Sequence, residues 1–248
     1  MSEIQFKVFR GQEAKGQLFE FTVEVTEGMV VLDAIHQIQS RHANDLAVRW
    51  NCKAGKCGSC SAEVNGKPRL MCMTRMDELP RDLPIKIEPM KSFPHMKDLV
   101  TDVSRNYELN KSIRPLQPKS RETDGTYRMK QEDIERIQEF HKCIECFLCQ
   151  DVCHVNRYQT AEKFAGPRFL IRIASLVMHP LDTIDRLKEI KEVFGIGFCN
   201  ITKCCTEVCP EHIRITDNAI IPLKERVAGA FYDPLAYLWR NFTSNPKK

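Results

Sequence analysis

Twelve cysteines are the residues of this chain most able to do chemistry, and they fall into three groups, within residues 52–72, 143–153 and 199–209. Thiolates are soft ligands for iron–sulfur clusters and zinc, whereas disulfide frameworks are typical of short secreted chains. The opening stretch MSEIQFKVFRG has neither an apolar signal core nor an Arg- and Ser-rich leader. The pattern therefore predicts reduced, metal-binding thiols in a cytosolic setting.

The first group, CKAGKCGSC followed by LMC, has the C-x4-C-x2-C spacing of plant-type [2Fe–2S] proteins. A loop around such a cluster must follow a tight path, which Gly55 and Gly58 permit. Zinc is the alternative, but zinc knuckles usually pair two short cysteine elements, and here three thiols share one loop. The predicted [2Fe–2S] ligands are Cys52, Cys57, Cys60 and Cys72.

The second and third groups, CIECFLCQDVC and CNITKCCTEVCP, resemble the runs of bacterial two-cluster ferredoxins, C-x2-C-x2-C-x3-C-P. In those proteins the fourth cysteine of each run binds the cluster of the other run. This rule predicts a [4Fe–4S] cluster whose ligands are Cys143, Cys146, Cys149 and Cys209.

The remaining site has only three thiolates, from Cys153, Cys199 and Cys205. Thr202 stands in the fourth ligand position and is not a soft ligand, so we expect a [3Fe–4S] cluster. Cys204 adjoins Cys205, and consecutive side chains point in different directions, so it is predicted to be a buried thiol without a metal. His154, which replaces the proline expected after Cys153, is interpreted as a packing or capping residue rather than a proton carrier.

Other classes of function find little support. The net charge of +4 is dispersed, without a basic block typical of nucleic-acid binding. The sequence has no run of 18 apolar residues that would span a membrane. It also has no dinucleotide fingerprint, phosphate-binding loop or nucleophile elbow. Three clusters that each pass one electron predict a path for electron transfer.

The first hundred residues have the periodicity of strands around one helix. Apolar residues alternate over 4–8 and 19–25, whereas VLDAIHQI (31–38) has helical spacing. Asn65-Gly66 predicts a two-residue hairpin turn, and a last strand runs through Ile85 and Ile87. The first cysteine loop lies between the helix and the hairpin.

The rest of the chain is predicted to be helical after a polar connector over about 89–130. Three apolar helix faces are expected, through Ile134, Ile137 and Phe140; Phe169, Leu170, Ile173 and Val177; and Leu181, Ile184, Leu187 and Ile190. The domains are placed at residues 1–104 and 105–248. The end of the chain, DPLAYLWRNF, carries Leu235, Leu238, Trp239 and Phe242 and is expected to dock on the helical domain. The alternative is that it extends a contact with a partner subunit.

With these motifs, the sequence resembles the iron–sulfur subunits of succinate dehydrogenase and fumarate reductase, over nearly its whole length. The resemblance rests on CKAGKCGSC, PHMKDLVTDVSRNY, CIECFLC, CNITKCCTEVCP and IRITDNAIIPLKERV. It implies an α+β fold, with an N-terminal β-grasp plant-type ferredoxin domain and a C-terminal all-α bacterial-ferredoxin-like domain. It also implies an oxidoreductase subunit that relays electrons between a FAD-bearing flavoprotein subunit and a membrane quinone, without catalytic residues of its own.

The positions that would lie near the quinone depart from the usual pattern. Tyr158 stands where relatives have a quinone-contacting Trp, Asn200 follows Cys199 where many have His, and His154 follows Cys153. This variation resembles the branch with a haem b-bearing integral membrane anchor of cytochrome b type and menaquinone. The resemblance implies a peripheral place on the cytoplasmic face of the bacterial membrane, held by partner subunits.

The alternative from another class is a soluble iron–sulfur electron donor to a heterodisulfide- or glycolate-type oxidoreductase. Such proteins often carry two full [4Fe–4S] runs, and Thr202 argues against that arrangement. An iron–sulfur sensor would need an effector or DNA-binding module, which the sequence does not contain. The direction of the succinate–fumarate reaction does not follow from the cysteine pattern, since cluster potentials depend on burial and hydrogen bonding.

Overall fold

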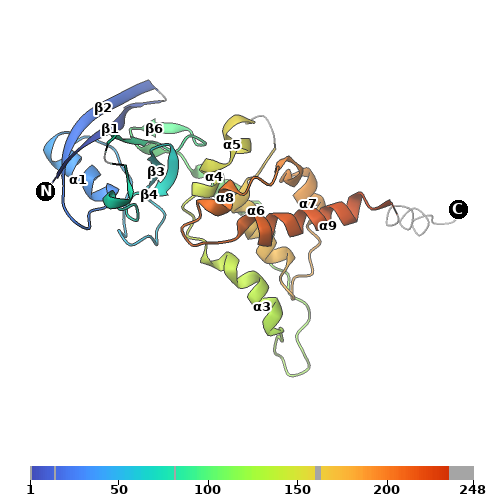
Figure 1. The fold of residues 1–248 in the computed structure, drawn as a ribbon. Coiled ribbons are helices and arrows are strands. Elements are labelled where there is room, and N and C mark those ends of the chain that lie inside the picture. The colour runs from blue at the N-terminus through green and yellow to red at the C-terminus, as the bar shows by residue number, and fades with distance from the viewer. Residues whose placement is uncertain (1, 14, 81, 160–162, 235–248) are drawn as a thin grey trace.

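The structure is a computed structural model that describes residues 2–13, 15–80, 82–159 and 163–234. A mixed sheet with helix α1 forms most of the N-terminal half, and helices form the C-terminal half (Figure 1). The expected docking residues Leu235, Leu238, Trp239 and Phe242 lie outside the described residues. Within the described ranges, none of the helices has the length and apolar character needed to cross a bilayer.

The sheet, as far as the structure describes it, runs in the order β4-β3-β5-β1-β6-β7, with β2 paired to β1. β1 and β2 are antiparallel, whereas β1 and β5 are parallel, with Phe6 opposite Ile85. Each predicted strand is confirmed. The bounds are β1 Ser2–Gln12, β2 Lys15–Val25, β3 Ser61–Val64, β4 Lys67–Leu70, β5 Ile85–Glu88, β6 His95–Lys97 and β7 Val100–Thr101.

The first apolar core lies between this sheet and helix α1 (Val31–Arg41). Side chains alternate between the two faces of a strand, so Phe6, Val8 and Val23 all point inward and are fully buried. Cys146 and Leu148 of the second cysteine group belong to the same core. The second cysteine group is therefore packed against the N-terminal half.

The region 89–130, predicted to be a polar connector, contains β6, β7 and helix α2 (Ser104–Lys111), which the sequence analysis did not identify. The two strands were missed because a polar side chain, Asp98, holds them in place. Asp98 is buried and accepts hydrogen bonds from Arg10 Nε at 3.1 Å, from Gly11 N at 2.9 Å and from Ala47 N at 2.8 Å. A buried carboxylate that organises backbone in this way leaves no hydrophobic period in the sequence.

The C-terminal half packs around helix α6, which begins at Pro167, since proline is favoured in the first turn of a helix. Its apolar face, with Phe169, Leu170 and Ile173, is buried in a second core. The helices are α3 Gln131–Gln138, α4 Leu148–Val152, α5 His154–Tyr158, α6 Pro167–Val177, α7 Leu187–Glu192, α8 Cys204–Glu207 and α9 Ile221–Phe231, with 3₁₀ turns at Met76–Glu78, Glu139–Lys142 and Ile196–Phe198 and a π-helical turn at Ile215–Ile220.

The expected helix face through Leu181, Ile184, Leu187 and Ile190 forms only from Leu187 onward. Asp182 explains the difference. Its Oδ1 atom accepts hydrogen bonds from the backbone of Gln117, at 3.2 Å, and of Ile184, at 3.3 Å. Such side-chain to backbone bonds compete with helix formation, so the chain stays irregular up to Arg186.

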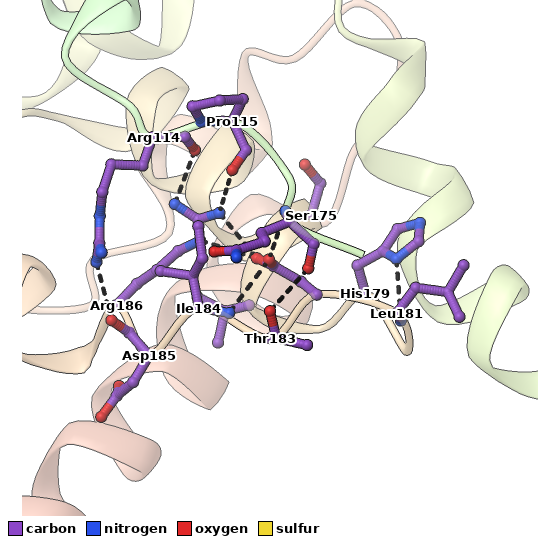
Figure 2. Close-up of polar contacts among 12 residues, drawn as sticks. Arg114, Pro115, Ser175, His179, Leu181, Thr183, Ile184, Asp185 and Arg186 are labelled. Carbon is purple, nitrogen blue, oxygen red and sulfur yellow. Dashed lines mark hydrogen bonds and ion pairs between the residues drawn. The ribbon is translucent and has the colours of Figure 1, made fainter. Parts of the chain in front are cut away.

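Arg186 fastens this irregular segment to the connector (Figure 2). Its buried guanidinium donates hydrogen bonds to the carbonyl oxygens of Arg114, at 2.8 Å, and Pro115, at 3.2 Å. It also forms an ion pair of 2.8 Å with Asp182. The buried Arg186 guanidinium thus holds residues 114–115 next to residues 182–186.

A second buried group of charges joins the two halves. Glu63 of β3 and Asp151 of α4 have fully buried side chains, and Arg157 of α5 forms ion pairs with both. Lys91 also pairs with Glu63, at 2.8 Å, and Ser92 N donates to Asp151 at 2.9 Å. Burial raises the pKa of Asp151 from 3.8 to about 6, against the opposing effects of the Ser92 hydrogen bond and the charge of Arg157.

This raised pKa predicts a pH dependence of stability. Folding favours the protonated Asp151, so its contribution is present below pH 4 and is lost as the pH rises through about 6. We expect Asp151→Asn to remove this component, which is worth about 2 kcal/mol between pH 4 and 7. The melting temperatures of the wild type and of Asp151→Asn, measured between pH 4 and 7, would show this difference. The same pH profile in both proteins would contradict the prediction.

Asp182→Asn is the matched control with the opposite sign. Burial acts to raise the pKa of Asp182, but hydrogen bonds from Arg186 and the neighbouring backbone lower it overall. Its contribution to stability is therefore present above its ordinary pKa and lost as the pH falls. The variant should be destabilised most at pH 7 and least at low pH.

Candidate functional site

The first cysteine loop lies between α1 and β3, as predicted, and aims backbone N–H groups at its sulfurs. The Cys52 sulfur accepts hydrogen bonds from Ala54 N and Lys56 N, each at 3.3 Å. Lys53, Gly55 and Gly58 have left-handed φ values of 54°, 66° and 67°. Such turns form concave sites whose amide groups attract anions. The loop is thus suited to an anionic iron–sulfur cluster.

The thiols of this loop have pKa values shifted in opposite directions. Burial acts to raise the pKa of Cys57, but hydrogen bonds from Ser59 and Cys52 outweigh it and lower the pKa to about 6. Burial raises the pKa of Cys60 to about 12. A thiolate ligand at Cys60 would need the positive charge of a bound metal to stay ionised.

The second site is a cavity bordered by all four cysteines of the predicted [4Fe–4S] set. The cavity volume is about 20 Å³, and Arg168 and Ile171 of α6 close one side. Burial raises the pKa of Cys146 to about 12 and that of Cys149 well above its ordinary value. The structure therefore brings together Cys143, Cys146, Cys149 and Cys209, although the last two are 60 positions apart in the sequence.

The third site brings together the remaining predicted ligands. Burial raises the pKa of Cys205 to about 11, against a hydrogen bond with Thr216 that lowers it, and the neighbouring thiols of Cys204, Cys199 and Cys153 contribute to the rise. Burial likewise raises the pKa of Cys153, and Cys204 and Cys199 add to the rise. All four thiols thus lie close enough to interact.

Cys204 differs from its prediction in burial. It is half-buried rather than buried, and its sulfur lies 3.3 Å from Thr202 Oγ1. Cys205, the next residue, is buried at 7% exposure. The two neighbouring thiols therefore point in different directions, as expected, and Thr202 is on the exposed side with Cys204.

Left-handed backbone conformations also occur in the second and third cysteine loops, residues 143–153 and 199–209, although these loops contain no glycine. Glu145 and Phe147 have φ values of 57° and 61°, and Ile201 and Lys203 have values of 61° and 63°. Non-glycine residues adopt this conformation at a cost of order 1 kcal/mol or more each, and such strain concentrates at functional sites. Sequence reasoning missed these positions because only glycine signals a left-handed turn.

The first and second cysteine loops touch through their backbones. A Cβ atom on Gly58 would lie only 2.7 Å from Cys146 Cα and 2.9 Å from Cys146 N. Ser61 Oγ also donates a hydrogen bond of 2.9 Å to the Cys146 carbonyl oxygen. The first and second sites are therefore direct neighbours.

The second and third sites share their supporting elements. Cys149 lies on α4 and Cys153 directly follows it, while Cys205 lies on α8 and Cys209 follows two residues after its end. Helices α4 and α8 are packed against each other. The three cysteine sites consequently form one continuous series.

Gly58 allows a sharp test of the contact between the loops. Gly58→Ala adds a methyl group that must push the Cys146 backbone away, and its left-handed φ adds strain. We expect destabilisation of about 2–3 kcal/mol and slower electron transfer beyond the first site, with [2Fe–2S] retained. Thermal melts and rapid-mixing kinetics of cluster reduction measure these effects.

Gly28→Ala provides the control, because Gly28 has a φ of 79° and nothing within 4 Å of the added Cβ. The Gly28→Ala variant therefore has the strain of a left-handed backbone but makes no close contact like that between Gly58 and Cys146. Equal effects of the two variants would show that the loop contact is unimportant.

The three residues predicted to lie near a quinone flank the third site along the chain. His154 is half-buried, and its Nε2 atom is buried without a hydrogen-bond partner among the described residues. Tyr158 is 79% exposed and Asn200 is exposed. Sequence reasoning did not single out Val193, Phe198 and Ile201, which add exposed apolar surface on the same stretches of chain.

Comparison with known proteins gives consistent matches. Residues 5–108 match the family of 2Fe-2S iron-sulfur cluster binding domains. A chain of the Mycobacterium smegmatis Sdh1 complex in the apo form is 60% identical, with a TM-score of 0.90, over 94% of this chain and 98% of that one. The succinate dehydrogenase iron-sulfur subunit of Bacillus subtilis is 30% identical over 90% of this chain and 88% of its own.

Longer relatives also match. A subunit of the fumarate reductase (CoM/CoB) of Methanothermobacter marburgensis is 32% identical over 94% of this chain. This chain spans only 46% of that relative's length, and 42% of another such relative. Since the matches to subunits of similar length cover most of both chains, the chain belongs to the family of succinate dehydrogenase and fumarate reductase iron–sulfur subunits.

Proposed function

We propose that this chain relays single electrons between a flavin-bearing succinate/fumarate subunit and a membrane quinone. The observation that carries the proposal is the continuity of the three cysteine sites, from the Gly58–Cys146 contact to the α4–α8 pair. Isolated structural metal sites would not need to adjoin one another. Together with family membership, this continuity favours a path for electrons.

The proposed cofactors are [2Fe–2S], [4Fe–4S] and [3Fe–4S] clusters on the three predicted cysteine sets. When bound, they supply one-electron redox centres. The protein residues hold them by thiolate ligation, direct amide N–H groups toward their sulfurs, and exclude water by burial. In this proposal residues 1–104 form a β-grasp ferredoxin domain and residues 105–248 a helical ferredoxin-like domain.

The first site is proposed to face the flavoprotein subunit, whose cofactor would be FAD. Cys52 is exposed, and Trp50 beside it is 47% exposed. Lys53 Nζ lies 4.9 Å from the centre of the Trp50 ring, which leaves an aromatic and cationic surface at this end. Aromatic residues are enriched in the centres of protein interfaces.

The third site is proposed to face an integral membrane anchor of cytochrome b type, with a haem b and menaquinone as its cofactors. Exposed apolar residues near this site, Val193, Phe198 and Ile201, support a docking role, as does the exposed ring of Tyr158. His154, Tyr158 and Asn200 would then lie near the quinone. The chain would be held peripherally on the cytoplasmic face of the membrane.

The test is extraction of the native complex with mild detergent. The chain should co-purify with a flavoprotein and a membrane subunit, contain about nine iron atoms, and show a paramagnetic [3Fe–4S] signal when oxidised. Succinate should reduce quinone in this preparation. A chain that is free in the cytosol, and that reduces no quinone with its flavoprotein, would overturn the proposal in favour of a soluble electron donor.

A further inference from the structure

Arg168 is a buried cation at the edge of the second cysteine site. It is the second residue of α6, directly after Pro167, and only 5% of it is exposed. Its side chain borders the cavity formed by the four cysteines of the proposed [4Fe–4S] set. Pro167 fixes the backbone at the start of the helix, next to the position that carries Arg168.

The hydrogen bonds of this guanidinium are incomplete. Its Nη2 atom forms an ion pair and hydrogen bond with Glu145 of the second cysteine loop. Its Nε atom is buried and has no partner among the described residues. A charged N–H group left buried without an acceptor is costly, so an acceptor outside the polypeptide is indicated.

The charge of Arg168 lies beside the cysteines. Arg168 is buried and borders the cavity together with all four of them. Arg172, one turn further along α6, is exposed and is not among the residues that border the cavity. Water screens the charge of Arg172, whereas that of Arg168 lies in a medium of low dielectric constant.

We propose that Arg168 donates its Nε–H to a sulfur of the [4Fe–4S] cluster and thereby raises the cluster's reduction potential. The inference rests on the proposed cluster assignment. Reduction adds negative charge to the cluster, and a nearby cation and N–H donor stabilise the reduced form more than the oxidised one. Glu145, whose side chain is 38% exposed, orients the guanidinium and cancels part of its charge.

Substitutions of Arg168 and of Glu145 are expected to shift the cluster's reduction potential in opposite directions. Arg168→Gln removes the charge and the Nε–H, so the reduced-to-oxidised ratio of the [4Fe–4S] cluster at a fixed ambient potential should fall at least tenfold. For a one-electron couple that is about 59 mV. Glu145→Gln removes the opposing charge and should raise the ratio, by about two- to fivefold because Glu145 is partly exposed.

Arg172→Gln is the matched control, since it removes the same charge from the same helix at an exposed position. It should change the ratio less than twofold. All variants are measured in the assembled complex by redox titration with paramagnetic resonance detection. The [2Fe–2S] and [3Fe–4S] potentials serve as internal references and should stay constant.

The hydrogen bond itself has a separate readout. In wild-type complex labelled with ¹⁵N-arginine, pulsed paramagnetic resonance of the reduced [4Fe–4S] cluster should show a ¹⁵N coupling that Arg168→Gln removes and Arg172→Gln keeps. If Arg168→Gln loses the cluster altogether, the wild-type coupling and the Glu145→Gln shift decide the question.

A wild-type complex without a [4Fe–4S] signal would overturn the proposed function, and the inference with it. A wild-type signal without ¹⁵N coupling, together with shifts no larger than those of Arg172→Gln, would overturn the role of Arg168 alone.

Discussion

Replacing Cys209 by serine is expected to remove the [4Fe–4S] cluster, although Cys209 belongs to the third cysteine group. The residue borders the same cavity as Cys143, Cys146 and Cys149. A serine hydroxyl is a harder ligand than a thiolate, so the cubane would lose one of its four anchors. Iron content should fall by about four atoms per chain, and the reduced [4Fe–4S] signal should disappear.

Cys204→Ser is the matched control, because it also changes one half-buried thiol of the same loop to a hydroxyl. Iron content and all three cluster signals should be unchanged. If Cys209→Ser instead removes only the trinuclear cluster, the crossed arrangement of ligands is wrong. If Cys204→Ser removes that cluster, Cys204 is a ligand.

The second large effect is expected at Thr202. Thr202→Cys supplies a fourth thiolate beside the third site, between the left-handed residues Ile201 and Lys203. The site should then bind a fourth iron and form [4Fe–4S]. Because the added ligand is anionic, the potential should fall, on the order of 100 mV or more. The paramagnetic signal of the oxidised protein should be lost, and quinone reduction should slow.

Thr202→Ser keeps a hydroxyl and should retain the trinuclear signal and its potential. Iron analysis separates the two variants directly, since only the cysteine variant should gain about one iron per chain. A cysteine variant that keeps nine irons and the oxidised signal would show that Thr202 does not occupy the open corner.

The strands, and the meeting of Cys209 with the second cysteine group at one cavity, were predictable because their signals are local or follow a spacing rule. Alternation of apolar residues identified β1, β2 and β5, and Asn65 and Gly66 do take the left-handed φ values that a two-residue hairpin turn requires. The crossed cysteine sets followed from the two-cluster spacing rule. That rule concerns ligand chemistry, so it can be applied without knowledge of the packing.

The missed features depend on polar contacts between distant segments. β6 and β7 form around the buried carboxylate of Asp98, which joins residues far apart in the sequence. The shortened helix α7 results from Asp182 and Arg186, whose partners include Gln117 and Arg114. Arg168 likewise has no sequence signature, because its role depends on where α6 lies against the cysteine loops. Hydrophobic periodicity carries no information about such contacts.

The packing of the second cysteine loop into the first apolar core has a consequence for biogenesis. Cys146 and Leu148 complete a core otherwise built from residues 4–99. During synthesis the N-terminal half emerges first, and its apolar surface near β4 stays uncovered until residues 144–148 have left the ribosome. The nascent chain therefore exposes this surface during the interval in which its cysteines are also open to oxidation. A chaperone that shields the surface would protect both, and iron delivered to Cys143, Cys146 and Cys149 would close the core and fix the order of maturation.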